Sequence, residues 1–309
     1  MTSNAPESRA FDFRETAIDT VGRNLKLWLF NRLTAGSLGL FLRGGDIISA
    51  PPQIFGVYEP KIVELIGYLA DQGYGDFLID VGANLGLIAC QSGPRFQEVH
   101  MFEPNPLLCN VLKTNAALAL EPSRTFIYDH ALGDSSGTAT LRVPKHNWGG
   151  AFVNDGANAY RESLLAEKDG FSEFDDSNYI DLQISIRPTA EALPELFRSL
   201  HARGLTQGVI KIDVEGYEAT IIKGIAAALP KNFKVCIIFE CLEKDWPIGD
   251  IVDAFGGRAK VASLRTATPW RRHWPNWLKL MSLAVRPKFS TTLEQTEGIE
   301  SRDMVLFIQ

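Results

Sequence analysis

The sequence lacks the residue patterns that mark several protein classes. Its four cysteines include no C-x-x-C pair, and its histidines show no H-x-x-x-H spacing, so the common patterns of a zinc site are absent. We therefore expect the cysteines to be buried, reduced thiols. No G-x-S-x-G elbow of a serine hydrolase is present. No apolar run approaches the roughly 20 residues of a membrane-spanning helix, and the polar start MTSNAPESRA has no signal peptide. We therefore expect a protein of the reducing cytoplasm.

The chain also lacks an excess of positive charge. The formal net charge is -6 over 309 residues, so we expect no nucleic-acid partner. Hydrophobic residues make up 45% of the chain and charged residues 22%, as in soluble globular proteins. The length allows one large domain or two smaller ones.

What the sequence does contain is an alternation of strand-like and helix-like segments. Helical patterns begin at Pro60, Leu87, Leu107 and Ala219. Short apolar segments rich in β-branched residues lie between and after them, at 77–82, 98–104, 125–131, 208–214, 235–240, 259–265 and 304–309. This order predicts an α/β fold with a mostly parallel sheet and helices on both faces.

Three segments fall outside the alternation. Residues 1–55 form a helical N-terminal extension, which we expect to act as a lid or an oligomer arm, and residues 56–309 form the main domain. Insertions interrupt that domain at 144–180 and 266–302. The second insertion places tryptophans among basic residues over 268–288, which suits a peripheral membrane contact, an acceptor-docking patch or a small satellite core.

The first strand leads directly into a glycine-containing turn, DVGANLG at 80–86. Glu103 ends the next strand about 20 residues later, where doubly wound folds bind the ribose hydroxyls of a nucleoside. The turn lacks the second glycine of the G-x-G-x-x-G dinucleotide fingerprint, so a ligand without phosphate, such as S-adenosylmethionine, fits it better. The predicted cofactor-binding residues are Asp80, Gly82, Ala83, Asn84, Gly86, Glu103, Pro104, Asn105, Asp129, His130 and Asp213.

The third predicted strand ends in Asp129 and His130. In an open α/β sheet the ligand lies outside the carboxyl ends of the strands, so Asp129 is placed to accept a hydrogen bond from an adenine amino group. His130 is either an edge contact of the ligand or a capped loop residue.

Several ordered motifs resemble the FkbM-type S-adenosylmethionine-dependent methyltransferases. They are YEP at 58–60, IDVGANLG at 79–86, FEPNP at 102–106, ALGDSSG at 131–137 and VIKIDVEGYEATIIKG at 209–224. The resemblance implies a class I methyltransferase fold of about seven strands, the last antiparallel, and O-methylation, commonly of sugar hydroxyls. One departure stands at 187–193, where RPTAEAL replaces the family's frequent Thr-Leu-Asp, so no substrate role is carried over to Glu191.

Charged residues cluster at the end of the strand in VIKIDVEGYE, at 209–218. Asp213 is the predicted catalytic base, with Lys211 and Glu240 beside it at the same sheet edge. Two alternatives remain: Asp213, Glu215 and Glu240 bind Mg²⁺ or Ca²⁺, or the charges form a structural ion-pair network.

The sequence thus predicts an O-methyltransferase that uses S-adenosylmethionine and acts on a sugar hydroxyl of a carbohydrate-bearing small molecule or glycolipid. The alternatives are an NAD-dependent nucleotide-sugar oxidoreductase and a non-catalytic binding module of the same fold. We expect a cytoplasmic protein, with attachment to the inner face of the membrane as one option and a homo-oligomer as another.

Overall fold

The computed structural model describes residues 20–153, 175–241, 246–267, 275, 290–296 and 298–309. An eight-stranded sheet forms its centre, in the order β11-β10-β12-β9-β8-β1-β2-β3. The strands are β1 (Phe77–Val81), β2 (Glu98–Phe102), β3 (Thr125–Tyr128), β8 (Gln207–Ile212), β9 (Lys234–Glu240), β10 (Ala259–Ala267), β11 (Ser290–Gln295) and β12 (Asp303–Ile308). From β3 to β9 neighbouring strands are parallel, whereas β12 runs antiparallel to both β9 and β10.

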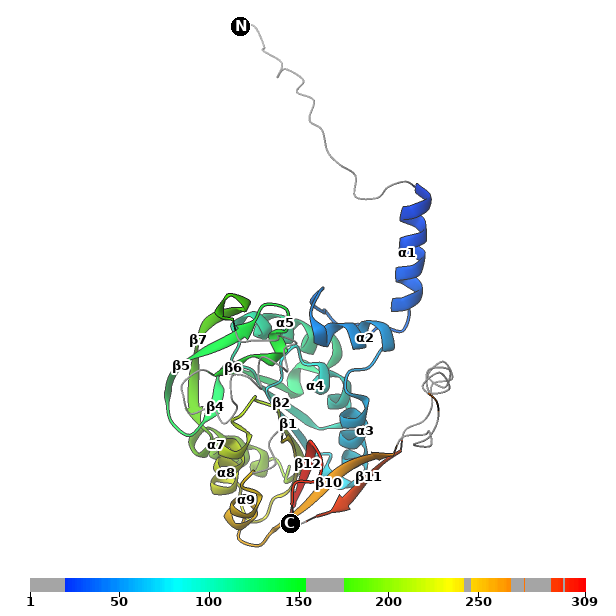
Figure 1. Cartoon of the computed structure of the whole chain (residues 1–309). Coiled ribbons are helices and arrows are strands. Elements are labelled where there is room, and N and C mark those ends of the chain that lie inside the picture. The colour runs from blue at the N-terminus through cyan, green and yellow to red at the C-terminus, as the bar shows by residue number, and fades with distance from the viewer. Residues whose placement is uncertain (1–19, 154–174, 242–245, 268–274, 276–289, 297) are drawn as a thin grey trace, which may run out of the picture.

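Helices cover both faces of this sheet (Figure 1). On one face lie α3 (Pro60–Leu69), α4 (Leu87–Ser92) and α5 (Pro106–Ala119), and on the other α7 (Thr189–Ala202), α8 (Glu218–Ala228) and α9 (Ile248–Ala254). The strands are apolar on both sides because successive residues face opposite helix layers: Leu78 packs in the first layer and Ile79 in the second.

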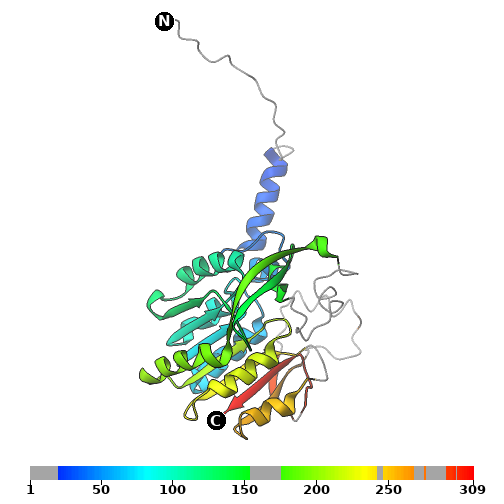
Figure 2. The ribbon, with the colours of Figure 1, turned by 90° about the vertical axis from the view of Figure 1, so that its left-hand side faces the viewer.

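A second, four-stranded sheet lies between β3 and α7 in the chain, in the order β4-β7-β5-β6. Its strands are β4 (Ala131–Gly133), β5 (Gly137–Pro144), β6 (Phe152–Val153) and β7 (Tyr179–Pro188). Leu141, Val143, Val153 and Ile184 form its small apolar core. In Figure 2 these strands cross in front of the main sheet.

The sequence-based description needs three corrections. The main sheet has eight strands rather than about seven, because β11 lies within the predicted insertion at 266–302 and pairs with β10. The predicted strand 125–131 is two strands, since Asp129 and His130 lead the chain from β3 into the smaller sheet. The predicted insertion at 144–180 contains β6 and the start of β7. Most of 268–288 lies outside the described residues.

The described part of the predicted N-terminal extension, residues 20–55, contains α-helices. Helix α1 (Thr20–Thr34) projects from the body, and a short turn η1 (Ile47–Ser49) and helix α2 (Ala50–Phe55) follow it (Figure 1). Among the described helices none is both long and apolar enough to cross a membrane.

Gly208 of β8 offers a test of the packing in the centre of the sheet. It lies opposite Phe77, and a Cβ there would stand 2.4 Å from the Phe77 ring. Because Phe77 is fully buried, we expect Gly208→Ala to lower the free energy of unfolding by about 1–3 kcal/mol, measured by urea denaturation.

The matched control is Gly137→Ala in β5, where no atom lies within 4 Å of the added methyl group. Equal denaturation midpoints for the two variants would contradict this account of the core.

Candidate active site

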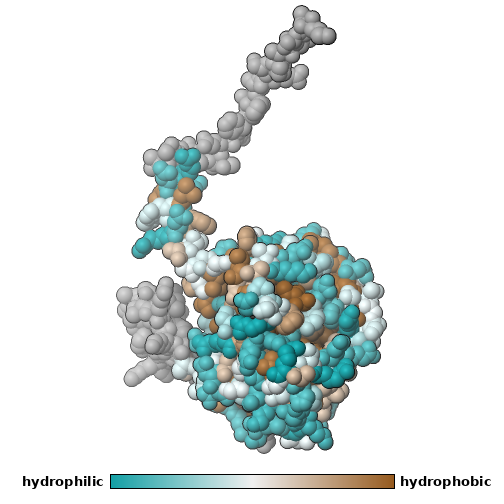
Figure 3. Space-filling model, turned by 180° about the vertical axis from the view of Figure 1, so that it is seen from behind, coloured by the Kyte–Doolittle hydropathy of each residue, from teal (hydrophilic) through white to brown (hydrophobic). Residues whose placement is uncertain are grey.

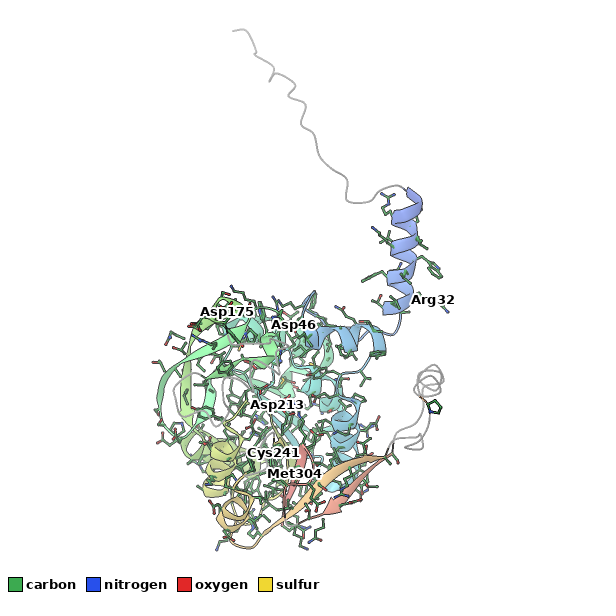
Figure 4. The ribbon with its side chains drawn as sticks, in the orientation of Figure 1. Arg32, Asp46, Asp175, Asp213, Cys241 and Met304 are labelled. Atoms are coloured by element: carbon green, nitrogen blue, oxygen red, sulfur yellow. The ribbon has the colours of Figure 1, made fainter. Side chains whose placement is uncertain are left out.

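A pocket opens at the carboxyl ends of β1, β2 and β8. It has an empty volume of about 960 Å³, its open mouth included, which is within the range of small-molecule sites. Figure 4 shows Asp213 at the centre of the molecule, where these strand ends meet. The pocket is lined by Tyr58, Val81, Gly82, Ala83, Asn84, Leu87, Ile88, Phe102, Glu103, Pro104, Leu108, His130, Ala131, Leu132, Leu141, Trp148, Gly149, Ala151, Val153, Ile186, Lys211, Asp213, Val214, Glu215 and Tyr217.

Gly82 makes the close approach of two strand ends possible. Its φ is 79°, and a Cβ on it would lie 1.9 Å from the carbonyl oxygen of Asp213. The Gly82 and Ala83 amides donate to the carbonyl oxygen of Phe102, each at 3.0 Å. The backbone of Asp213 therefore excludes a side chain at position 82.

Glu103 is held in place by the two backbone segments beside it. Its carboxylate accepts hydrogen bonds from the amides of Asn84 and Asn105, each at 2.8 Å. Burial raises the pKa of Glu103 to about 7, although these two hydrogen bonds act in the opposite direction. An ionised carboxylate has lone pairs left after two such bonds, so Glu103 can accept further hydrogen bonds from a ligand in the pocket.

Lys211 lies between two carboxylates. Its Nζ is 3.4 Å from Oδ1 of Asp80 and 3.3 Å from Oδ2 of Asp213. Burial lowers the pKa of Lys211, but the charges of Asp80, Asp213 and Glu59 more than offset it and raise the pKa above its usual value. Lys211 is therefore an ammonium ion, and it holds the partly exposed carboxylate of Asp213 at the pocket wall.

Tyr58 and Glu59 join this charged cluster, a role that we did not assign to them from the sequence. Glu59 has a φ of 44° at the start of α3, and burial together with the charge of Asp213 raises the pKa of its carboxyl group. Burial is the largest cause that raises the pKa of Tyr58, and the charges of Glu59 and Asp213 raise it further. The phenol of Tyr58 is therefore a neutral hydrogen-bond donor. The YEP motif at 58–60 was the available signal.

The structure brings together most, but not all, of the predicted cofactor and catalytic residues. Those in the pocket wall are Gly82, Ala83, Asn84, Glu103, Pro104, His130, Lys211 and Asp213. Asp80 is buried beside Lys211 and outside the wall, and Gly86 and Asn105 cap α4 and α5. Asp129 is exposed and outside the wall, so the structure does not place it on the pocket.

Glu240 lies outside the wall of the main pocket, apart from Glu215 of the metal alternative. Glu240 is paired with Arg302 and lines a neighbouring hollow, which Lys211 and Asp213 also border. Within the described ranges no group of three or more His, Cys, Asp or Glu side chains could hold a metal ion. Asp213, Glu215 and Glu240 are therefore not assembled as a metal site.

Trp148 closes the pocket from the side of the smaller sheet, and no sequence motif identified it as a site residue. The Arg43 guanidinium lies 4.1 Å from the centroid of its ring, and Oδ2 of Asp46 accepts from its amide at 3.1 Å. The indole Nε1 of Trp148 and Nε2 of His130 are buried and make no hydrogen bond within the described part of the chain. Two buried polar atoms in one pocket wall indicate that a polar ligand completes their hydrogen bonding.

Three solved structures that resemble this chain have low sequence identity to it. One is a precorrin-8w decarboxylase of Methanobacterium thermoautotrophicum, with 13% identity over 87% of this chain and 98% of the other, at a TM-score of 0.35. A methyltransferase of Agrobacterium tumefaciens has 9% identity over 83% of this chain and 64% of the other, with a TM-score of 0.39. A precorrin-6y C5,15-methyltransferase of Geobacter metallireducens has 8% identity over 87% of this chain and 93% of the other, with a TM-score of 0.37. No curated protein sequence matches the chain.

The family comparison is decisive. The model of the methyltransferase FkbM domain matches residues 80–257, more than half of the chain and all of the segment that carries the glycine turn, Glu103 and the charged strand end. The resemblance and the class I fold predicted from the sequence are confirmed. The chain belongs to the FkbM methyltransferase family and is an S-adenosylmethionine-dependent methyltransferase.

Proposed function

We propose that the enzyme methylates a hydroxyl oxygen on a carbohydrate-bearing acceptor. The observation that carries this proposal is the carboxylate of Asp213, which is held by Lys211 in the pocket wall and is 35% exposed. An alcohol is a weak nucleophile until its proton is withdrawn, so an O-methyltransferase needs a base beside the reacting oxygen. Asp213 fits that need.

The residues of the pocket fit S-adenosylmethionine. Glu103 can accept hydrogen bonds from ribose hydroxyls, and the turn at Gly82–Asn84 brings bare backbone beside it. Trp148 Nε1 and His130 Nε2 supply the polar atoms that lack a partner in the described residues. Apolar walls from Leu141, Val153 and Ile186 complete the enclosure.

When bound, S-adenosylmethionine supplies an electrophilic methyl group. The Asp213 carboxylate accepts the hydroxyl proton of the acceptor as the oxygen attacks. Lys211 keeps Asp213 oriented and stabilises its negative charge before the proton arrives. Tyr58 lines the same pocket as a neutral donor, and the rings around the pocket exclude water.

Aromatic and acidic side chains support a carbohydrate as the acceptor. Tyr58, Trp148 and Tyr217 line the pocket together with Glu215 and Asp213. Aromatic rings pack against the apolar faces of sugars, and carboxylates accept hydrogen bonds from their hydroxyls. The experiment is transfer of a tritiated methyl group to fractionated cell glycans. Labelled glycan supports the proposal, and label on protein or nucleic acid alone contradicts it.

The alternatives considered from the sequence separate in binding experiments. Family membership favours S-adenosylmethionine over NAD, and tight binding of NAD with none of S-adenosylmethionine would reverse that assignment. Binding of S-adenosylmethionine without turnover on any acceptor would favour the non-catalytic module.

Removal of Glu103 tests the cofactor site. Glu103→Ala eliminates charge-assisted hydrogen bonds to the ribose, so we expect calorimetry to show weaker S-adenosylmethionine binding by about 1.5–3 kcal/mol. The pKa of about 7 also predicts that wild-type affinity rises from about pH 6 to pH 8, because the ionised carboxylate is the better acceptor.

Glu103→Ala should lose the rise in S-adenosylmethionine affinity between about pH 6 and pH 8. Any pH dependence that remains in this variant reports the titration of the ligand itself. Glu121→Ala, at an exposed glutamate after α5, is the control and should bind as the wild type does. An affinity for Glu103→Ala that equals the control at pH 8 would remove Glu103 from the site.

Replacement of Asp213 tests the chemistry. Asp213→Asn keeps the size and an oxygen toward Lys211 but removes the basic group. We expect turnover to fall by about 10²–10⁴-fold while the affinity for S-adenosylmethionine changes little. Initial rates and calorimetry on one preparation measure both.

The control is Asp250→Asn on the exposed surface of α9. If Asp213→Asn loses thermal stability and activity together, Asp213 acts as a structural partner of Lys211 and is not the base. Full activity of Asp213→Asn would exclude both the structural and the catalytic role.

A further inference from the structure

Helix α1 carries large apolar side chains that the rest of the described chain leaves exposed. Leu25, Leu27, Trp28, Leu29, Phe30 and Leu33 each have between 49% and 62% of their surface exposed. Figure 3 shows brown side chains along this helix as it stands away from the body. An exposed apolar surface of this size marks a contact with another molecule.

The charge of α1 restricts what that molecule can be. The helix, TVGRNLKLWLFNRLT, contains Arg23, Lys26 and Arg32 and no acidic residue, although the whole chain has a formal net charge of -6. Packing of two α1 helices against each other would bring like charges together without an acidic partner on either helix. A negatively charged surface complements the helix.

The spacing of the apolar residues suits an interface between water and lipid. Leu25, Leu29 and Leu33 recur every four residues and form a stripe with Trp28, whereas Leu27 and Phe30 project from other sides of the helix. Long basic side chains beside such a stripe reach the headgroups, and tryptophan is favoured at that depth. With 15 residues the helix is about 22 Å long, shorter than the roughly 30 Å hydrocarbon core, so it would lie in the plane of the surface.

The apolar surface continues from α1 towards the pocket. Phe41, Ile47, Ile54 and Phe55 are between 45% and 71% exposed. Ile48, the neighbour of Ile47, packs in the cluster that contains Trp148. Ile47 is therefore one residue away from a side chain that packs in the same cluster as the pocket-lining Trp148.

We propose that α1, extended by Phe41, Ile47, Ile54 and Phe55, binds the surface of an anionic lipid bilayer. The helix lies in the interface with its leucine stripe and Trp28 towards the acyl chains, and its basic residues contact the lipid headgroups. This places the methyltransferase body, with its pocket, against the membrane. The proposal does not depend on which acceptor is methylated.

Flotation of the full chain with vesicles tests the proposal. Vesicles of phosphatidylcholine with about a third phosphatidylglycerol are compared with phosphatidylcholine alone, at low and at high salt. We expect binding to the anionic vesicles that weakens with salt. The triple variant Arg23→Glu, Lys26→Glu, Arg32→Glu should bind at least on the order of 100-fold more weakly.

The matched control reverses three exposed lysines of the main body, Lys231→Glu, Lys234→Glu and Lys260→Glu, so that the net charge is identical. It should bind as the wild type does, and Leu25→Ser with Leu29→Ser should bind weakly despite unchanged charge. Unaltered thermal unfolding of each variant shows that the body is intact.

Three results would overturn the proposal. The first is no flotation of the wild type at low salt, and the second is equal loss in the triple variant and its charge-matched control. The third is a dimer in light scattering that Leu25→Ser with Leu29→Ser dissociates, without any vesicle binding, which would show that a second copy covers the helix.

Discussion

The site depends on one ion pair at the centre of the main sheet. Lys211 of β8 and Asp80 of β1 are direct partners in the parallel register, and both side chains are buried. A buried charge is costly unless it is paired, so each of these residues needs the other. Lys211 then has a second carboxylate within reach, Asp213, two residues further along the same strand face. The ion pair thus supports a third charge at the surface of the pocket, where it can meet a ligand.

The backbone around this pair is held in unusual conformations. Among the described residues the non-glycine residues with positive φ are Glu59, Asn84 and Glu215, and each borders the charged pocket or the hollow next to it. Such conformations cost on the order of 1–3 kcal/mol each and persist where surrounding contacts enforce them. The Asn84 amide is bound by Glu103, and Glu218 accepts from the amides of Val214 and Gly216 on either side of Glu215. Acidic side chains therefore shape the turns as well as the chemistry.

The sequence predicts the features of this fold that rest on local patterns. Apolar strand segments and the turn at Gly82 locate β1, β2, β8 and β9, and parallel register then brings Glu103, Lys211 and Asp213 to one edge. The smaller sheet was not predicted from the sequence, although IDLQISIR at 180–187 alternates apolar and polar residues as a half-exposed strand does. The exposure of Asp129 could not be foreseen, because it follows from the chain leaving β3 for β4. Pairing of β11 with β10 is equally non-local.

The pocket is closed by segments that are far apart in the sequence, which explains why Trp148 could not be recognised from its neighbours. Asp46 accepts hydrogen bonds from the amides of Ile48 and Trp148, and Arg43, paired with Asp46, lies over the indole ring. One buried carboxylate thereby joins the N-terminal segment to the loop before β6. The contacts of Asp46 and Arg43 with Trp148 span about a hundred residues of chain, so no local pattern encodes them. The N-terminal segment consequently supports the wall of the active site through its contacts with Trp148, and its exposed apolar residues are joined to those contacts through the backbone of residues 43–48.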